Sequence, residues 1–246
     1  MKLPHADLVS MNESFHGMLT LGVTMNSQKN GVERGESIRL IDFEHPENSN
    51  FLVVNQFTVI EGTENKRPDI VLFVNGLPLV ITELKNAVDE NATIETAWNQ
   101  LQTYKETIPS LVAYNARLIV SDGLEARAGS LTANYSRFLS WKSYDGINEA
   151  EYKKSQLEVL VHGLLNKKTL LDVIRFFSVF ERTKTTDAKG QISLRIVKKI
   201  AAYHQYYAVN KAIQSVIEAS ERTDEQVPFN KEDGLCTREM DLRIGL

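Results

Sequence analysis

The sequence predicts an α/β protein with a mixed β-sheet flanked by helices and followed by a helical segment. Two observations predict this class. Up to about residue 131, short runs rich in β-branched and aromatic residues alternate with turn residues, and one stretch with helical spacing interrupts them. From about residue 150, apolar residues recur at helical spacing. The resulting order, β-β-β-β-α-β-β and then helices, implies a mixed sheet with a crossover helix.

The elements before the central hairpin are short. Residues 1–35 are predicted to be weakly ordered because "NSQKNGVERGES" is polar and rich in turn residues. "SIRLIDF" (37–43) predicts a strand, and "HPENSN" (45–50) a turn. "FLVVNQFTVI" (51–60) predicts a second strand, and residues 61–67 a loop.

The segment "RPDIVLFVNGLPLVITELKNA" (67–87) predicts a β-hairpin, because two apolar runs flank an Asn-Gly pair. Asp69 and Glu83 face each other only if paired residue numbers sum to 152. We expect that register to require a loop with an odd number of residues, such as Asn75–Leu77 with a glycine bulge at its centre.

A helix is predicted over residues 94–108, after the helix-start residues "DENAT" and before Pro109, which ends it. Two further strands are expected at 116–123 and 124–131.

The part of the chain from residue 150 onward is predicted to be mainly helical. Two amphipathic helices are expected at 150–166 and 168–180, a polar loop at 181–192 and a long helix at 194–221. The tail, 221–246, has no clear period and is expected to be loop or frayed.

Composition excludes several classes of protein. No apolar run approaches the roughly 18 residues of a membrane helix, and the N-terminus lacks the apolar centre of a secretory signal. One cysteine, Cys236, excludes an internal disulfide framework, and the five histidines are too scattered to favour a zinc site. We therefore expect a cytoplasmic protein without a membrane partner.

Charge is distributed unevenly along the chain. Residues 151–200 carry 11 Lys/Arg against 5 Asp/Glu, whereas the other 196 residues carry 17 against 27. A basic stretch on an acidic protein can contact nucleic-acid phosphate. A solvated helical surface explains the same pattern equally well.

Three charges stand in the otherwise apolar hairpin. Residues two apart in a strand share a face, so Glu83 and Lys85 point the same way, and Asp69 begins the partner strand. Two neighbouring carboxylates raise a pKa unless a cation lies between them, and a hard divalent cation takes oxygen ligands. A lysine beside that cation can stabilise phosphate charge or help activate a water. Phosphodiester hydrolysis needs this set of groups, but the spacing is easily met by chance, and a charged sheet edge, with Lys85 opposing edge pairing, is the more common explanation of the pattern alone. The surroundings favour the nuclease, because Asp69 follows Pro68 and the Glu-Leu-Lys triplet ends a strongly apolar strand.

Longer sequence matches make the predicted function more specific. "PD" at 68–69 and "ELK" at 83–85 match the PD-(D/E)xK nuclease signature, and "QLQTY" at 100–104 matches its QxxxY extension. Over about 36–220 the chain resembles the R (restriction) subunit of type I restriction-modification enzymes. The segments that carry this resemblance are "LIDFEHPENSNFLVVNQF", the hairpin, "WNQLQTYK" and "YHQYYAVNKAI".

The resemblance implies roles for individual residues. Asp69 and Glu83 would ligate Mg²⁺ or Mn²⁺, with the Leu84 carbonyl as a third ligand, and Lys85 would be the catalytic lysine. Gln100 and Tyr104 share a helix face and would orient the DNA strand or steady the site. Tyr104 also continues the apolar stripe and could be simple core.

The resemblance also implies an organisation: a restriction-endonuclease-like domain over 36–182, then a linker and the truncated start of a helicase-like motor over 183–246. In the full-length protein the motor would bind ATP, with Gln205 facing the adenine; helix packing is the more common role for tyrosines such as those around Gln205. The implied partners are double-stranded DNA and the methyltransferase and specificity subunits. The implied enzyme is a type I site-specific deoxyribonuclease, and we expect this piece of it to be weak or inactive alone.

Two departures from the family leave alternatives open. The family continues into a Walker A loop, which has no match here, and a helical segment that precedes the match in the family is largely absent. The site could therefore be incomplete. A degenerate nuclease fold that serves DNA binding or subunit assembly is the main alternative, and a repair or phage exonuclease on the same fold is another.

Overall fold

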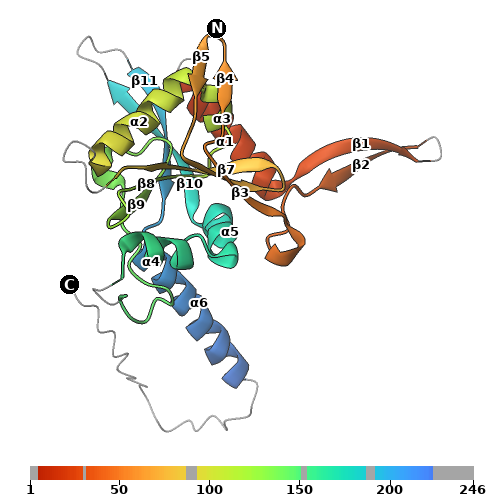
Figure 1. Cartoon of the computed structure of the whole chain (residues 1–246). Coiled ribbons are helices and arrows are strands. Elements are labelled where there is room, and N and C mark those ends of the chain that lie inside the picture. The colour runs from red at the N-terminus through yellow and green to blue at the C-terminus, as the bar shows by residue number, and fades with distance from the viewer. Residues whose placement is uncertain (1–4, 30–31, 87–92, 151–153, 187–191, 224–246) are drawn as a thin grey trace. The chain divides into compact units, whose positions relative to one another are not determined.

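The computed structural model describes residues 5–29, 32–86, 93–150, 154–186 and 192–223 (Figure 1). The chain divides into two compact units, residues 1–207 and residues 208–246. The first unit contains the sheet and every element discussed below except most of the last helix.

The centre of the first unit is a five-stranded mixed sheet. Its strand order is β3-β6-β7-β8-β9, and the β7–β8 pair is parallel while the other pairs are antiparallel. Helix α2 (Ile94–Thr107) is the crossover between the two parallel strands. The predicted mixed sheet with a crossover helix is confirmed. The strands are β3 (Phe51–Asn55), β6 (Ile70–Val74), β7 (Leu77–Leu84), β8 (Arg117–Ser121) and β9 (Ala126–Gly129).

Both faces of the sheet are covered, so alternate strand residues enter two different apolar cores. Ile81 and Leu118 belong to the core formed with α2 and α3 (Pro109–Val112). Val80 and Ile119 belong to the core formed with the helices of the other face, α4 (Gln156–Gly163) and α5 (Lys167–Phe176) (Figure 1). Burial on both faces explains why the central strands read as continuous apolar runs.

The β6–β7 hairpin has the predicted register but reaches it differently. Ile70 pairs with Thr82, so the numbers of paired residues sum to 152 at this end of the hairpin, as predicted. Continued by one residue, this register puts Asp69 opposite Glu83. The expected odd loop is wrong: Val74 pairs with Leu77 around a two-residue Asn-Gly turn, both of whose residues have positive φ. The register changes between Leu72 and Phe73, which leaves Leu79 as an extra residue. The irregularity lies beside Pro78, which has no N–H to donate to the ladder.

The prediction that residues 1–35 are weakly ordered is wrong for the described part. Helix α1 (His5–Leu21) buries Leu8, Phe15 and Leu19 against the body of the unit. The polar Asn12, one turn after Leu8, is also buried and donates its amide to the carbonyls of Ala113 and Asn115. A polar residue in the middle of the buried stripe hid the helical pattern. Two strands follow α1 and pair antiparallel, β1 (Val23–Lys29) and β2 (Val32–Ile38).

The strand predicted over 37–43 is also wrong. Strand β2 ends at Ile38, and the Asp42 carboxylate accepts the N–H groups of Glu44 and His45. Such a side-chain turn competes with a strand for the backbone donors. A 3₁₀ turn, η1 (Pro46–Asn48), follows where a turn was expected.

The strand predicted over 51–60 is divided in two. Strand β3 ends at Asn55, and Gln56 has a left-handed φ of 52°. The chain then forms a small hairpin, β4 (Val59–Glu61) with β5 (Glu64–Lys66), in place of the expected loop at 61–67.

The second half of the chain contains more strand than predicted. The expected loop at 181–192 and the start of the long helix form an antiparallel pair, β10 (Ser178–Thr186) with β11 (Ile192–Ile200). Apolar residues alternate with polar ones over much of β11, which is a strand period that the helical reading overlooked. The long helix, α6 (Tyr203–Thr223), begins only after β11, and a 3₁₀ turn, η2 (Tyr135–Arg137), precedes α4.

The predictions for the helix at 94–108 and for the two strands after it agree with the structure. Helix α2 and strands β8 and β9 confirm the predicted helix and the two strands after it. Of the helix-start segment before α2, Thr93 is described: its hydroxyl accepts the Thr96 N–H and caps the helix, which confirms its predicted role. Residues 89–92 of that segment and the tail beyond residue 223 lie outside the described residues. Of the helices described, none combines the length and the apolar character required to cross a membrane.

Candidate active site

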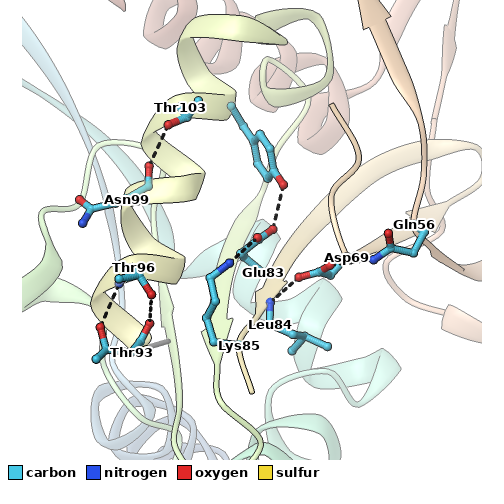
Figure 2. Close-up of polar contacts among 10 residues, drawn as sticks. Gln56, Asp69, Glu83, Leu84, Lys85, Thr93, Thr96, Asn99 and Thr103 are labelled. Carbon is cyan, nitrogen blue, oxygen red and sulfur yellow. Dashed lines mark hydrogen bonds and ion pairs between the residues drawn. The ribbon is translucent and has the colours of Figure 1, made fainter. Parts of the chain in front are cut away.

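The end of strand β7 and the last turn of helix α2 bring the predicted aromatic side chain, Tyr104, to Glu83. Figure 2 shows Asp69, Glu83 and Lys85 close together there. Glu83 is 4% exposed, and both of its carboxylate oxygens accept hydrogen bonds. Lys85 Nζ donates to Oε1 at 3.0 Å, and the Tyr104 hydroxyl donates to Oε2 at 3.0 Å. Lys85 itself remains 25% exposed. The site therefore has a buried carboxylate with a partly exposed cation beside it.

Asp69 immediately precedes β6 and lies beside the end of β7. Its Oδ2 accepts the backbone N–H of Leu84 at 2.8 Å, and its Oδ1 accepts the Gln56 side-chain amide at 2.7 Å. The Asp69 and Glu83 carboxylates are close enough for the charge on Asp69 to raise the pKa of Glu83. The expected neighbourhood of the two carboxylates is confirmed.

Burial is the main reason that the pKa of Glu83 is raised. The charge on Asp69 adds to this rise, whereas the hydrogen bonds from Lys85 and Tyr104 oppose it. The raised pKa agrees with the expectation for a carboxylate pair, but burial contributes more than the neighbouring charge. A carboxylate that ionises with difficulty is the kind of group that a bound cation would stabilise in its charged form.

Tyr104 is both a core residue and a polar partner of the site. It is 4% exposed and packs in the same core as Leu101 and Ile108. Burial first, and then the charge on Glu83, raise the pKa of its hydroxyl, while a hydrogen bond with the Gln100 side chain lowers it. Gln100 and Tyr104 therefore share a helix face, as predicted. Whether they orient DNA stays a prediction.

The donor set suits a hard divalent cation. Each carboxylate oxygen of Asp69 and Glu83 accepts one hydrogen bond from a described residue, and an oxygen of this kind has two lone pairs. Mg²⁺ and Mn²⁺ are bound by carboxylate oxygens together with carbonyls and waters. The Leu84 N–H, rather than its carbonyl, is the group that contacts Asp69, so the carbonyl as a third ligand stays a prediction. Across the described ranges, no three His, Cys, Asp or Glu side chains gather in a group that could hold a metal ion.

Gln205 is not part of this cluster. It lies in the first turn of α6, where its side-chain oxygen accepts the backbone N–H of Ala202 at 2.9 Å. The neighbouring tyrosines pack around Trp141, with ring centroids 5.8–6.3 Å away, which confirms helix packing as their role here. A contact between Gln205 and adenine stays a prediction.

The basic stretch 151–200 is partly used inside the fold. Lys198 is buried, and its ammonium donates to Asn12 Oδ1 at 2.9 Å and to the Asn115 carbonyl at 3.0 Å. Arg182 pairs with Glu13, and Lys199 pairs with Glu181. Exposed cations remain at Lys167 and Lys168, where α5 begins. Lys198 is therefore unavailable to DNA, whereas Arg182 and Lys199 are exposed but paired with carboxylates.

Sequence reasoning missed Gln56. No motif marks it, because its relation to Asp69 depends on the path of the β4–β5 hairpin between them. The one available signal was that Gln56, together with Asn55, interrupts an otherwise apolar run shortly before a run of turn residues.

Comparisons with known proteins agree with the predicted family. A family model described as "Type I restriction enzyme R protein N terminus" matches residues 2–137. The HindI type I restriction enzyme endonuclease subunit of Haemophilus influenzae is 46% identical over 225 residues, which are 90% of this chain and 21% of that protein.

Two more distant relatives carry similar names. The putative MjaIXP endonuclease subunit of Methanocaldococcus jannaschii is 32% identical over 236 residues, covering 88% of this chain and 21% of that protein. The SauCOLORF180P endonuclease subunit of Staphylococcus aureus is 29% identical over 169 residues, which cover 68% of this chain and 16% of that protein. The chain thus spans about a fifth of the length of the first two relatives. The chain belongs to the family of type I restriction enzyme R protein N-terminal regions.

Proposed function

We propose that this chain is the endonuclease module of a type I restriction enzyme R subunit, and that it hydrolyses phosphodiester bonds of double-stranded DNA with Mg²⁺ or Mn²⁺. The observation that carries the proposal is the proximity of three charged groups at one end of the sheet. Asp69 lies beside Glu83, and the Lys85 ammonium is 3.0 Å from a Glu83 oxygen. The names of the relatives, endonuclease subunits of type I enzymes, support the same function.

Each side chain has a role that its position supports. Asp69 and Glu83 would hold the cation, which when bound would supply charge neutralisation and a more acidic water. Lys85, partly exposed beside Glu83, would stabilise the negative charge that develops on the phosphate during attack. Tyr104, through its bond to Glu83, would keep that carboxylate in one orientation.

The remaining functions belong to the full-length protein. We propose that cleavage there is coupled to ATP-driven translocation, with Gln205 in the motor's nucleotide site. We also propose that the subunit assembles with methyltransferase and specificity subunits. The specificity subunit would read the DNA sequence, so no base contacts are expected from this chain. These proposals rest on the family resemblance, because the chain covers about a fifth of the relatives.

The test compares cleavage and ATP hydrolysis in the full-length subunit within its complex. Asp69→Ala, Glu83→Ala and Lys85→Ala should each abolish DNA cleavage while ATP hydrolysis continues. Glu47→Ala, which removes an exposed carboxylate from the 3₁₀ turn η1, is the matched control and should cut normally. If all three variants still cut, the active site lies elsewhere. If the unmodified complex hydrolyses ATP but does not cut with either metal, the module is a degenerate nuclease fold used for binding or assembly.

A further inference from the structure

Gln56 and Asp69 close the base of the β4–β5 hairpin. Gln56 follows the last residue of β3, and Asp69 precedes the first residue of β6, so the hairpin leaves the sheet at one and returns at the other. Two bonds join them. The Gln56 side-chain amide donates to Asp69 Oδ1 at 2.7 Å, and its backbone N–H donates to the Asp69 carbonyl at 2.8 Å. Figure 2 shows the Gln56 amide directed at the carboxylate.

The backbone of Gln56 is unusual for its residue type. Its φ is 52°, in the left-handed region that favours glycine and, among other residues, asparagine. Among the described residues one other non-glycine has a positive φ, Asn75, and it lies in an Asn-Gly turn where that conformation is ordinary. Backbone strain of this kind persists where the surrounding structure requires it, and it is frequent at functional sites.

Contacts of the hairpin hold Gln56 in this position. The Glu61 carboxylate accepts the backbone N–H and the hydroxyl of Ser110, at 3.1 and 2.6 Å. Phe57 packs edge-on against Phe73 of β6, with ring centroids 5.2 Å apart. The segment that carries Gln56 is therefore attached both to the sheet and to the start of α3.

We propose that Gln56 is a positioning residue for Asp69 and that it sets the affinity of the site for a divalent cation. The inference rests on the proposed function. The Gln56 amide fixes one oxygen of Asp69, and the Leu84 N–H fixes the other, so the plane of the carboxylate is set. A second lone pair on each oxygen stays available for a cation shared with Glu83. Partners that orient a ligating carboxylate typically affect metal affinity by about 10- to 100-fold when removed.

The test measures Mn²⁺ binding to the purified chain by calorimetry, together with thermal unfolding of the metal-free protein. Gln56→Gly removes the amide but suits the left-handed backbone, and Gln56→Asn also suits the backbone but has a side chain one methylene too short. Both variants should bind Mn²⁺ about tenfold more weakly. The unfolding midpoint of Gln56→Gly should be unchanged or higher. Asn55→Ala, at the preceding exposed position, is the control and should bind as the unmodified chain does.

A purely structural role for Gln56 would lower the unfolding midpoint and the metal affinity together. In the complete enzyme, the Mg²⁺ concentration at half-maximal cleavage should rise about tenfold, while the rate at saturating Mg²⁺ recovers. Unchanged Mn²⁺ affinity in Gln56→Gly would overturn the inference. If Asp69→Asn binds Mn²⁺ as well as the unmodified chain does, the metal site is not here, and the proposed function fails with it.

Discussion

The Tyr104 hydroxyl and the Glu83 carboxylate, 21 positions apart in the chain, are joined by a buried hydrogen bond of 3.0 Å. This bond connects the crossover helix to the end of the strand that precedes it. The acidity and orientation of Glu83 therefore depend on how α2 packs on the sheet, and a change in the helix should be detectable in the chemistry of the site.

Replacing Tyr104 with phenylalanine tests this dependence. Tyr104→Phe keeps the ring in the core but removes a hydrogen bond to a buried carboxylate, which is worth roughly 1–3 kcal/mol. We expect the pKa of Glu83 to rise further, and cleavage by the full-length complex to fall while ATP hydrolysis stays unchanged. An NMR titration of the Glu83 carboxyl carbon measures the first effect. Tyr114→Phe, at a partly exposed ring, is the control. An unchanged pKa of Glu83 in the Tyr104→Phe variant would contradict the prediction.

Metal binding should depend on pH through Glu83. Since burial raises the pKa of this group, protons compete with the cation, and affinity for Mg²⁺ should fall as pH falls through that raised pKa. Bound cation stabilises the fold by about 2.7 kcal/mol at 100 times its Kd. The Mg²⁺-induced shift of the unfolding midpoint, measured from pH 5 to 8, should therefore grow with pH. Glu83→Gln should abolish the shift, and a shift that persists in this variant would place the cation elsewhere.

Lys198 should make stability increase with pH. Burial, and then the charge of Arg117, lower its pKa from 10.5 to about 7. Between those two values the unfolded chain binds the extra proton, so the free energy of unfolding should rise as pH rises from 7 toward 10.5. Burial also lowers the pKa of Arg117 to about 9 and of Lys105 to about 8, and both add to the slope.

The variant Lys198→Met isolates this contribution. Urea unfolding at several pH values between 6 and 9.5 should give a flatter dependence than in the unmodified chain. The slope should not vanish, because Arg117 and Lys105, the other two cations buried in the described part of the chain, remain. Lys199→Met, at the exposed neighbouring position, should keep the original slope. Equal slopes in all three proteins would show that Lys198 is charged in the folded state throughout this range.

Replacing each of two glycines with alanine should change the stability of the chain in opposite directions. A Cβ at Gly163 would lie 2.4 Å from the Trp141 ring, so Gly163→Ala should destabilise the chain by roughly 1–3 kcal/mol through overpacking. A Cβ at Gly17, inside α1, would meet no atom within 4 Å, so Gly17→Ala should stabilise it by about 0.5–1 kcal/mol. Chemical denaturation measures both. A neutral Gly163→Ala would mean that Trp141 can move aside.

The isolated chain should bind DNA weakly and with strong salt dependence. Part of the basic stretch is buried or paired, which leaves cations such as Lys167 and Lys168 to contact phosphate. Binding that rests on phosphate contacts weakens steeply between about 50 and 200 mM salt. A fluorescence titration with duplexes of different sequence should show this loss and no sequence preference. Tight, selective binding at high salt would identify a self-sufficient nuclease.

The sequence predicted the centre of the molecule well because there local pattern and tertiary packing agree. Apolar strand runs, the helical stripe of α2 and its stop at Pro109 each follow from neighbouring residues alone. The cluster of Asp69, Glu83 and Lys85 could be predicted because alternation along two strands, and one register, determines which side chains meet.

Other features depend on partners far away in the chain. Asn12 interrupts the stripe of α1 and is accommodated only by carbonyls about 100 residues later. The contact of Gln56 with Asp69 requires the intervening hairpin to fold back. In β11 the alternation was visible, but the helix that follows continues with a similar composition, so the boundary could not be located from local pattern.

The extra residue in strand β7 makes the site sensitive to the parity of the hairpin. If Leu79 paired with Leu72 instead of being left out of the ladder, the register near the turn would continue unchanged, Asp69 would oppose Thr82, and Glu83 and Lys85 would move to the opposite face. The strands could still pair, but the carboxylates would be separated by the thickness of the sheet. The bulge thus sets the reading frame of the structure: deleting Leu79 would remove the bulge and still leave Asp69 opposite Glu83, whereas a hairpin that kept Leu79 but paired it regularly could fold and could not hold a shared cation.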